Sequence, residues 1–243
     1  MILLQLIVAV AALAAMATGY GFVVLSAPLL ALMLPPHKVV PLTVALGWVL
    51  VTVLLARPSV WNAVDRPLTA RITVTGALGI PVGVLLLHVM DPATLRIVLG
   101  VVCAALALAG LARLTLPVQR PLTVYVTGFV CGMLSGSVGL AGPPVVLYLT
   151  SSRASKATFR GTAAAVNWLL ASITLIQLAL FRQLPPDLGG HVLSFLPALA
   201  IGGVLGVAVF PIFSSQRFRQ MALGLAAVSG VVAAATATLR SLP

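Results

Sequence analysis

Apolar stretches separated by charged or turn-forming residues run along the whole chain. Many of them approach the roughly 20 residues that a helix needs to cross the hydrocarbon core of a bilayer, which is about 30 Å thick. The pattern predicts helices at about 2–18, 22–34, 39–56, 68–88, 93–113, 121–138, 143–151, 161–181, 190–212 and 217–239.

Two of the gaps between these stretches are rich in glycine and contain no charged residue, and we call them the first and second breaks. The first covers residues 19–21 (GYG), and the second covers residues 136–144 (GSVGLAGPP). The apolar pieces that follow them, 22–34 and 143–151, are short for a membrane crossing. We therefore expect each of these pieces to be a half-helix that follows a break.

The order of the predicted elements repeats along the chain. Residues of one type recur at a nearly constant spacing: Gly19 and Trp48 return 120 positions later as Gly139 and Trp168, and Gly79 and Gly83 return 123 positions later as Gly202 and Gly206. Matches in a shared order indicate an internal duplication. We expect a first repeat at 1–117 and a second at 118–243, each with about four helices and a first helix that is broken or re-entrant at its glycine-rich segment.

Composition agrees with a membrane protein and leaves no room for a soluble domain. Hydrophobic residues make up 61% of the 243 positions, only 7% are charged, and the mean hydropathy is +1.19. A soluble domain would carry about a quarter charged residues. No basic residue precedes Lys38, so we interpret the first apolar stretch as a retained helix rather than a cleaved signal. The expected fold is an all-α polytopic membrane protein with a single transmembrane domain.

The net charge of +11 does not indicate nucleic-acid binding, because the basic residues are spread over short loops. Such loops mark the cytoplasmic side of a membrane protein. The basic loops and linker carry Arg57, Arg66 and Arg71, then Arg113 and Arg120, then Arg153, Lys156 and Arg160, and finally Arg217 and Arg219. The counterparts in the other half carry Lys38 alone, Arg182 with Asp187, or Arg96 with Asp91. Corresponding loops thus differ in charge, which favours two inverted repeats with both termini outside the cytoplasm.

Inverted repeats with broken helices are the arrangement in which secondary transporters build a binding site near the membrane midplane. A break frees backbone N–H groups, and the N-terminal end of a helix carries about half a positive charge, so a small anion satisfies both. Pro143 and Pro144 suit the first turn of a half-helix, and Gly139 and Gly142 permit backbone that a side chain would block.

Few polar side chains occur within the predicted helices, and they complete the candidate site. The candidate substrate-binding residues are Gly19, Gly21, Thr43, Trp48, Ser135, Ser137, Gly139, Gly142, Pro143, Pro144, Asn167 and Trp168. Membrane helices also use Ser, Thr and Asn for interhelical hydrogen bonds, and small residues for close packing. We assign close packing to Gly79, Gly83, Gly202, Gly203 and Gly206. Arg153 and Arg160 flank the second half-helix and are interpreted as topology determinants.

Groups for proton coupling, catalysis or metal binding are not evident. The chain has no Glu, and its three Asp residues fall in predicted loops, whereas a proton relay uses intramembrane carboxylates or histidines. Cys103 and Cys131 lie far apart without metal-binding spacing. We expect no cofactor and no enzyme activity, and we predict passive transport of an anion. Each negative charge that leaves the cell gains about 2.3 kcal/mol per 100 mV.

The segment Gly128–Val146, GFVCGMLSGSVGLAGPPVV, resembles the TauE/SafE sulfite-exporter family of membrane permeases. Gly136, Gly139, Gly142, Pro143 and Pro144 match the second-half motif of that family by position. The first half departs from the family pattern, because only two glycines precede Phe22. The resemblance implies transport of sulfite, thiosulfate, sulfoacetate or related organosulfonates across the inner membrane of a bacterium.

Other functions remain open on the sequence alone. A permease for another small anion fits the same features, and a membrane-embedded redox carrier or enzyme would need a catalytic pair that the sequence does not show. A scaffold subunit without a cavity is a further alternative. The expected partners are a small anion and the lipid bilayer, with no nucleic acid and with homo-oligomer formation left open.

Overall fold

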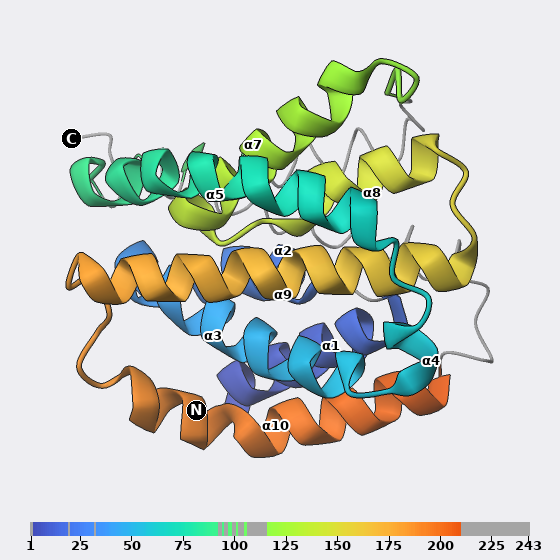
Figure 1. Ribbon diagram of the computed structural model, residues 1–243. Coiled ribbons are helices and arrows are strands. Elements are labelled where there is room, and N and C mark those ends of the chain that lie inside the picture. The colour runs from blue at the N-terminus through green and yellow to red at the C-terminus, as the bar shows by residue number, and fades with distance from the viewer. Residues whose placement is uncertain are drawn as a thin grey trace.

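The computed structural model describes residues 2–18, 20–31, 33–91 and 116–209, and single positions between 92 and 115. Every regular element in these ranges is a helix, as expected from the sequence (Figure 1). The helices are α1 (Ile2–Thr18), α2 (Phe22–Ala31), α3 (Pro36–Leu55), α4 (Pro58–Trp61), α5 (Arg66–Val89), α7 (Pro121–Val138), α8 (Gly142–Ser151), α9 (Lys156–Leu180) and α10 (Leu188–Val209).

Five of the described helices, α3, α5, α7, α9 and α10, are long and apolar enough to cross a membrane. Their outward faces carry large apolar side chains: Leu78, Leu180, Leu193 and Val204 are all at least 67% exposed. Apolar surface on this scale is suited to lipid rather than to water. The all-helical membrane architecture expected from the sequence is therefore confirmed for the described part of the chain.

Predicted helix bounds agree best where glycine or proline marks them. The predictions 2–18 and 121–138 coincide with α1 and α7, and α8 begins one residue before the predicted position. Helix α9 begins at Lys156 rather than 161, because the Ser155 hydroxyl accepts a hydrogen bond from the Thr158 N–H and caps the helix. The short α4 was not predicted. The predicted helices 93–113 and 217–239 lie largely or wholly outside the described residues.

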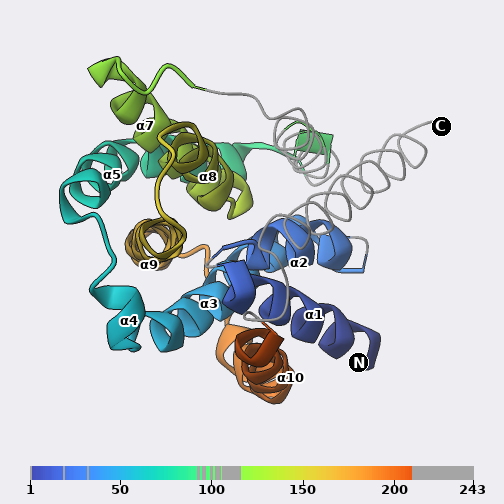
Figure 2. The ribbon, with the colours of Figure 1, turned by 90° about the vertical axis from the view of Figure 1, so that its right-hand side faces the viewer.

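The described helices form two packed groups, with α9 between them in the end-on view (Figure 2). One apolar core lies mainly among α1, α2, α3 and α10 and includes residues of α7 and α9. The other lies mainly among α5, α7, α8 and α9 with part of α3. The last described helix of each half packs against a helix of the other half: α5 lies against α7, and α10 lies against α1. The two halves of the chain are interlocked in space.

Glycine allows these two helix pairs to approach closely. A Cβ atom at Gly79 of α5 would lie 2.2 Å from the Phe129 carbonyl oxygen of α7, and one at Gly202 of α10 would lie 2.0 Å from the Ala9 carbonyl oxygen of α1. Such distances leave no room for a side chain, as in other membrane helix pairs with small residues at the contact. The packing role that the sequence suggested for Gly79 and Gly202 is confirmed, and Gly83 and Gly206 behave in the same way.

The residues that these glycines contact in the other half are also related by a spacing of 120 positions. Phe129 follows Ala9 by 120 positions, as α8 follows α2 and α9 follows α3 by the positions of their first residues. Apart from α4, the described helices of the two halves thus follow the same order at nearly the same spacing, and Gly79 and Gly202 make corresponding contacts.

Candidate functional site

The second glycine-rich break separates α7 from α8 through a left-handed turn. Gly139 has φ +77°, a conformation that L side chains rarely adopt, and its N–H donates to the Ser135 carbonyl over 3.1 Å. The next N–H, of Leu140, donates to the Leu134 carbonyl over 3.0 Å. The end of α7 is therefore closed by its own backbone, and these two N–H groups are not available to a ligand.

Helix α8 then offers fewer backbone donors than an ordinary helix start. Four N–H groups have no intrahelical partner at the beginning of a helix. Pro143 and Pro144 lie in this first turn and have no N–H, so the groups that remain are those of Ala141 and Gly142. All four residues are buried. The two prolines that begin the half-helix therefore leave two backbone donors at its start instead of four.

The first break meets the second. Gly21 has φ +103°, and the neighbouring Tyr20 is 6% exposed. A Cβ atom at Gly142 would lie 3.7 Å from the Tyr20 side chain, which is ordinary van der Waals contact. At Gly139, a Cβ atom would lie 3.3 Å from a methyl carbon of Val23, the second residue of α2. Residues of both breaks are thus brought together in the core, while Gly19 lies outside the described residues.

The candidate hydroxyl groups around the breaks make hydrogen bonds within the protein. Thr43, beside Gly139, donates to the Val39 carbonyl over 2.8 Å, and Ser137 donates to the Met133 carbonyl over 2.8 Å. Ser135 and Thr174 share a hydrogen bond of 2.8 Å between α7 and α9. Each hydroxyl has a single proton. In this conformation Thr43 and Ser137 act toward a ligand only as acceptors, which an anion does not need.

The two candidate tryptophans stack on each other where α3 crosses α9. The ring centroids of Trp48 and Trp168 lie 6.3 Å apart at an interplanar angle of 17°. The Trp48 Nε1–H donates to Ser172 Oγ over 2.8 Å, and the Trp168 Nε1–H donates to Thr52 Oγ1 over 2.9 Å. These contacts are reciprocal, and they require α3 and α9 to run antiparallel. Both indole N–H groups are therefore occupied by the protein.

Asn167 is the candidate side chain that remains uncommitted. It is half-buried on α9 next to Trp168, and its amide has no hydrogen-bond partner among the described residues. An amide offers two N–H donors and one acceptor. Of the polar side chains that the sequence indicated, Asn167 is thus the one that makes no side-chain hydrogen bond among the described residues, so both of its N–H donors can bind an anion.

The start of α9 holds the first break in place through two residues that sequence reasoning did not assign to the site. The rings of Phe159 and Tyr20 meet edge to face at 6.0 Å. The neighbouring Arg160 is half-buried and donates from its guanidinium to the carbonyl of Met16, in the last turn of α1. A cation favours the C-terminal end of a helix. Arg160 was expected to set topology only, and the structure gives it a contact at the end of α1.

Acidic residues lie at the ends of the described helices. Asp65 caps α5, Asp91 follows α5, and Asp187 precedes α10. No group of three or more His, Cys, Asp and Glu residues suited to a metal ion was found within the described ranges. Cys131 is buried in α7, and Cys103 lies outside those ranges.

Comparison with known proteins gives one match that spans most of the chain. Residues 4–233 match the family model described as Sulfite exporter TauE/SafE. No curated protein and no solved structure matches significantly.

Proposed function

The chain belongs to the TauE/SafE sulfite exporter family, and on that premise we propose that it is a permease for small sulfur-containing anions such as sulfite, thiosulfate, sulfoacetate or related organosulfonates. The family is one of membrane transporters, which agrees with the apolar spanning helices. The proposed direction is export, across the inner membrane of a bacterium.

The observation that carries this proposal is the meeting of the two breaks. Tyr20 of the first break lies against Gly142 of the second, at the N-terminal end of α8. A helix start provides partial positive charge and backbone donors for an anion. We propose that the substrate binds at the N–H groups of Ala141 and Gly142, with Asn167 as a side-chain donor. Because these backbone groups are buried, Tyr20 must move away from Gly142 before a substrate enters.

The proposed transport needs no proton relay within the membrane. The described acidic residues lie at helix ends, where they cap or link helices. An inside-negative potential favours the exit of an anion by about 2.3 kcal/mol per charge and 100 mV. The membrane potential would then suffice to drive export.

We further propose that the halves are inverted repeats. The antiparallel crossing of α3 and α9, with reciprocal bonds of Trp48 and Trp168, supports a two-fold relation between the halves. One end of the bundle carries the basic loops: the Asp65 N–H donates to Thr162 Oγ1 near the start of α9, and Arg57, Arg66, Arg153 and Lys156 belong to the same end. The excess of basic residues supports a cytoplasmic location for this end and an external location for the N-terminus.

Counterflow in proteoliposomes tests the function directly. Vesicles that contain only this protein and are preloaded with an unlabelled sulfonate should accumulate labelled sulfonate transiently, and preloading with chloride at equal ionic strength should not cause accumulation. Equal signals with sulfur oxyanions and with chloride would reject the proposed substrate class. The absence of counterflow with every sulfur oxyanion would reject the permease assignment for the isolated chain.

A further inference from the structure

A cavity of about 500 Å³ opens at the end of the bundle opposite the basic loops, where α3 begins and where α5 and α9 end. It does not include residues of the two breaks. Nitrogen-bearing side chains from three parts of the chain line it: His37 and Lys38 from α3, His88 from α5, and Arg182 and Gln183 from the turn after α9. We call it the basic cavity.

Arg182 projects from a backbone conformation that is unusual for its residue type. Its φ is +55°, and the N–H of the next residue, Gln183, donates to the Leu178 carbonyl over 2.8 Å and closes the end of α9. Glycine is the usual residue at such a position, because a side chain is disfavoured there. The local fold thus does not require arginine at position 182.

Arg153 provides an internal reference for this position. It follows α8 with φ +54°, and the next N–H, of Ala154, closes that helix end on the Leu149 carbonyl in the same way. Arg153 precedes α9 and Arg182 follows it, so the two residues lie at opposite ends of a 25-residue helix. They share a backbone role, and only Arg182 lines the basic cavity.

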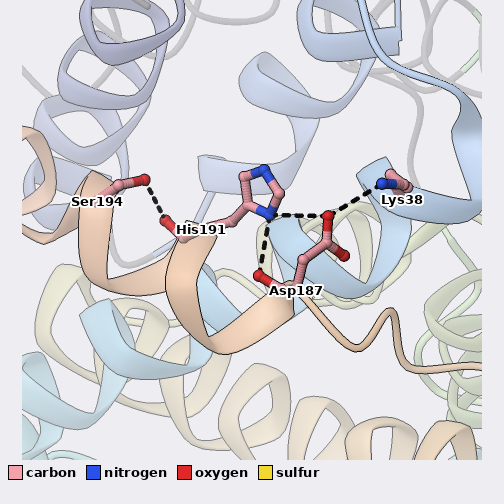
Figure 3. A network of polar contacts seen from close by, with 4 residues as sticks. All are labelled: Lys38, Asp187, His191 and Ser194. Carbon is pink, nitrogen blue, oxygen red and sulfur yellow. Dashed lines mark hydrogen bonds and ion pairs between the residues drawn. The ribbon is translucent and has the colours of Figure 1, made fainter.

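The positive charges of the basic cavity are only partly balanced. Lys38 Nζ lies 3.0 Å from Asp187 Oδ2, and His191 Nδ1 approaches the same carboxylate oxygen at 3.5 Å (Figure 3). The hydrogen bond from Lys38 holds the pKa of Asp187 below its usual range, so this carboxylate is ionised at neutral pH. No carboxylate lies within ion-pair distance of Arg182 among the described residues. Arg182 is therefore an exposed cation without a balancing carboxylate in the described part of the chain.

We propose that the basic cavity is a second binding site, for the head group of an organosulfonate, on the face opposite the basic loops. This inference rests on the proposed function and extends it to the outer access route. The guanidinium of Arg182 presents a planar fork of N–H donors that suits an oxyanion. Lys38 adds a point charge, for which the bound anion competes with Asp187.

The rest of the lining of the basic cavity is apolar, which favours an organic ligand. Leu87, Met90 and Leu184 line it together with the basic side chains. A volume of about 500 Å³ lies within the range of small-molecule sites and exceeds the space that one inorganic oxyanion fills. A sulfonate with a short alkyl tail would place its charge at Arg182 and its tail along this apolar wall.

Titration calorimetry tests the site. It measures the binding of propanesulfonate to the purified full-length protein in a zwitterionic detergent at neutral pH. Arg182→Gly should weaken binding by on the order of tenfold, the usual effect of losing one charged hydrogen-bond donor. Arg153→Gly should leave the affinity unchanged. Asp187→Asn should tighten binding a few-fold, because it removes the internal competitor for Lys38. The unfolding temperature of ligand-free Arg182→Gly should not fall, since glycine suits a positive φ.

Equal affinity of wild type, Arg182→Gly and Arg153→Gly would overturn the proposal. Equal affinity of the wild type for sulfite and for propanesulfonate would overturn the assignment of an organic ligand. Counterflow separates this inference from the proposed function. Sulfonate counterflow with an unchanged KM in Arg182→Gly rejects the cavity and leaves the permease standing. Binding that depends on Arg182, without any counterflow, supports the cavity and rejects the permease.

Discussion

At residue 142, the absence of a side chain lets Tyr20 lie against the start of α8. A Cβ atom there would be 3.7 Å from the Tyr20 side chain, so a single methyl group fits without displacement. Larger side chains would extend into the space that Tyr20 occupies, in a region where the neighbouring Pro143 and Pro144 are also buried. The size of residue 142 therefore controls how the two breaks meet.

Gly142→Leu should slow transport strongly, while Gly142→Ala should preserve it. Overpacking a core position costs about 1–3 kcal/mol. If the leucine side chain destabilises the conformation in which the two breaks meet by this amount, transport should slow by roughly tenfold or more. Counterflow of a labelled sulfonate measures the effect, and the amount of monodisperse protein reports folding. Gly189→Ala is a suitable control, because a Cβ atom there meets nothing within 4 Å. Full transport by the leucine variant would exclude the second break from the substrate route.

The residue types of the candidate site could be predicted from the sequence, but their hydrogen-bond partners could not. The 120-residue spacing paired Trp48 with Trp168, and the structure brings these rings together. The partners of their N–H groups, Ser172 and Thr52, depend on how α3 and α9 cross. Likewise, the contact of Arg160 with Met16 joins residues 144 positions apart. Local patterns carry no information about such contacts, because they arise from tertiary packing.

Helix bounds were predictable where the chain itself forces an end. Pro121 and the left-handed Gly139 define α7 through backbone geometry alone. The start of α9 was placed too late because Lys156 and Arg160 were interpreted as loop charges, whereas both lie in the first two turns of the capped helix. Basic side chains at a membrane surface are compatible with helix, since their heads reach water. Charge thus marks the membrane boundary rather than the end of a helix.

Gly202→Ala should destabilise the fold much more than Gly203→Ala, although the two residues are neighbours on α10. The added methyl group would lie 2.0 Å from the Ala9 carbonyl oxygen at position 202, but 3.4 Å from the flexible Leu50 side chain at position 203. The Ala9 carbonyl oxygen belongs to the backbone of α1 and can move away only if the helix moves. We therefore expect Gly202→Ala to lower the free energy of unfolding by about 1–3 kcal/mol or more. Thermal unfolding in detergent compares the two variants. Equal unfolding temperatures would contradict the close packing of α1 on α10.

The ion pair between Lys38 and Asp187 joins the start of α3 to the turn before α10 and should make stability depend on pH. Folding lowers the pKa of Asp187, chiefly through the hydrogen bond from Lys38. The pair therefore stabilises the folded state above the ordinary carboxyl pKa of about 4, and this contribution is lost as the pH falls through the lowered value. Wild type should unfold at a slightly higher temperature than Asp187→Asn at pH 7, because exposed pairs contribute little.

The difference between these two proteins should shrink as the buffer is acidified below about pH 4 and should also shrink in high salt, which screens exposed charges. A difference that persists in acid would assign the effect of the substitution to something other than the ion pair.

At the scale of the whole molecule, the interlocked helix pairs tie the two halves into one unit. Helix α5 packs against α7 across the halves, and α10 packs against α1 in the same way. Neither half can bury its own glycine-lined contact surface alone. The boundary between residues 117 and 118 therefore divides the proposed repeats along the chain without dividing the structure into separate domains.

Labelling from outside the cell decides whether these halves are inverted. Ser59 lies in α4, in the connection between α3 and α5, and Gly189 lies in the first turn of α10, after the corresponding connection of the second half. Both positions are exposed. Inverted repeats place such connections on opposite sides of the membrane, whereas a parallel duplication places them on the same side.

In a background with Cys103→Ala and Cys131→Ala, a membrane-impermeant maleimide should label Gly189→Cys in intact cells, and it should label Ser59→Cys only after the cells are permeabilised. We expect this result because an excess of basic residues near Ser59, including Arg57 and Arg66, favours a cytoplasmic location for that end. Labelling of both positions from outside would mean a parallel duplication. Labelling of Ser59→Cys in intact cells and of Gly189→Cys only after permeabilisation would still indicate inverted repeats, but with the opposite orientation in the membrane. The basic cavity would then face the cytoplasm, and the basic loops would face the exterior.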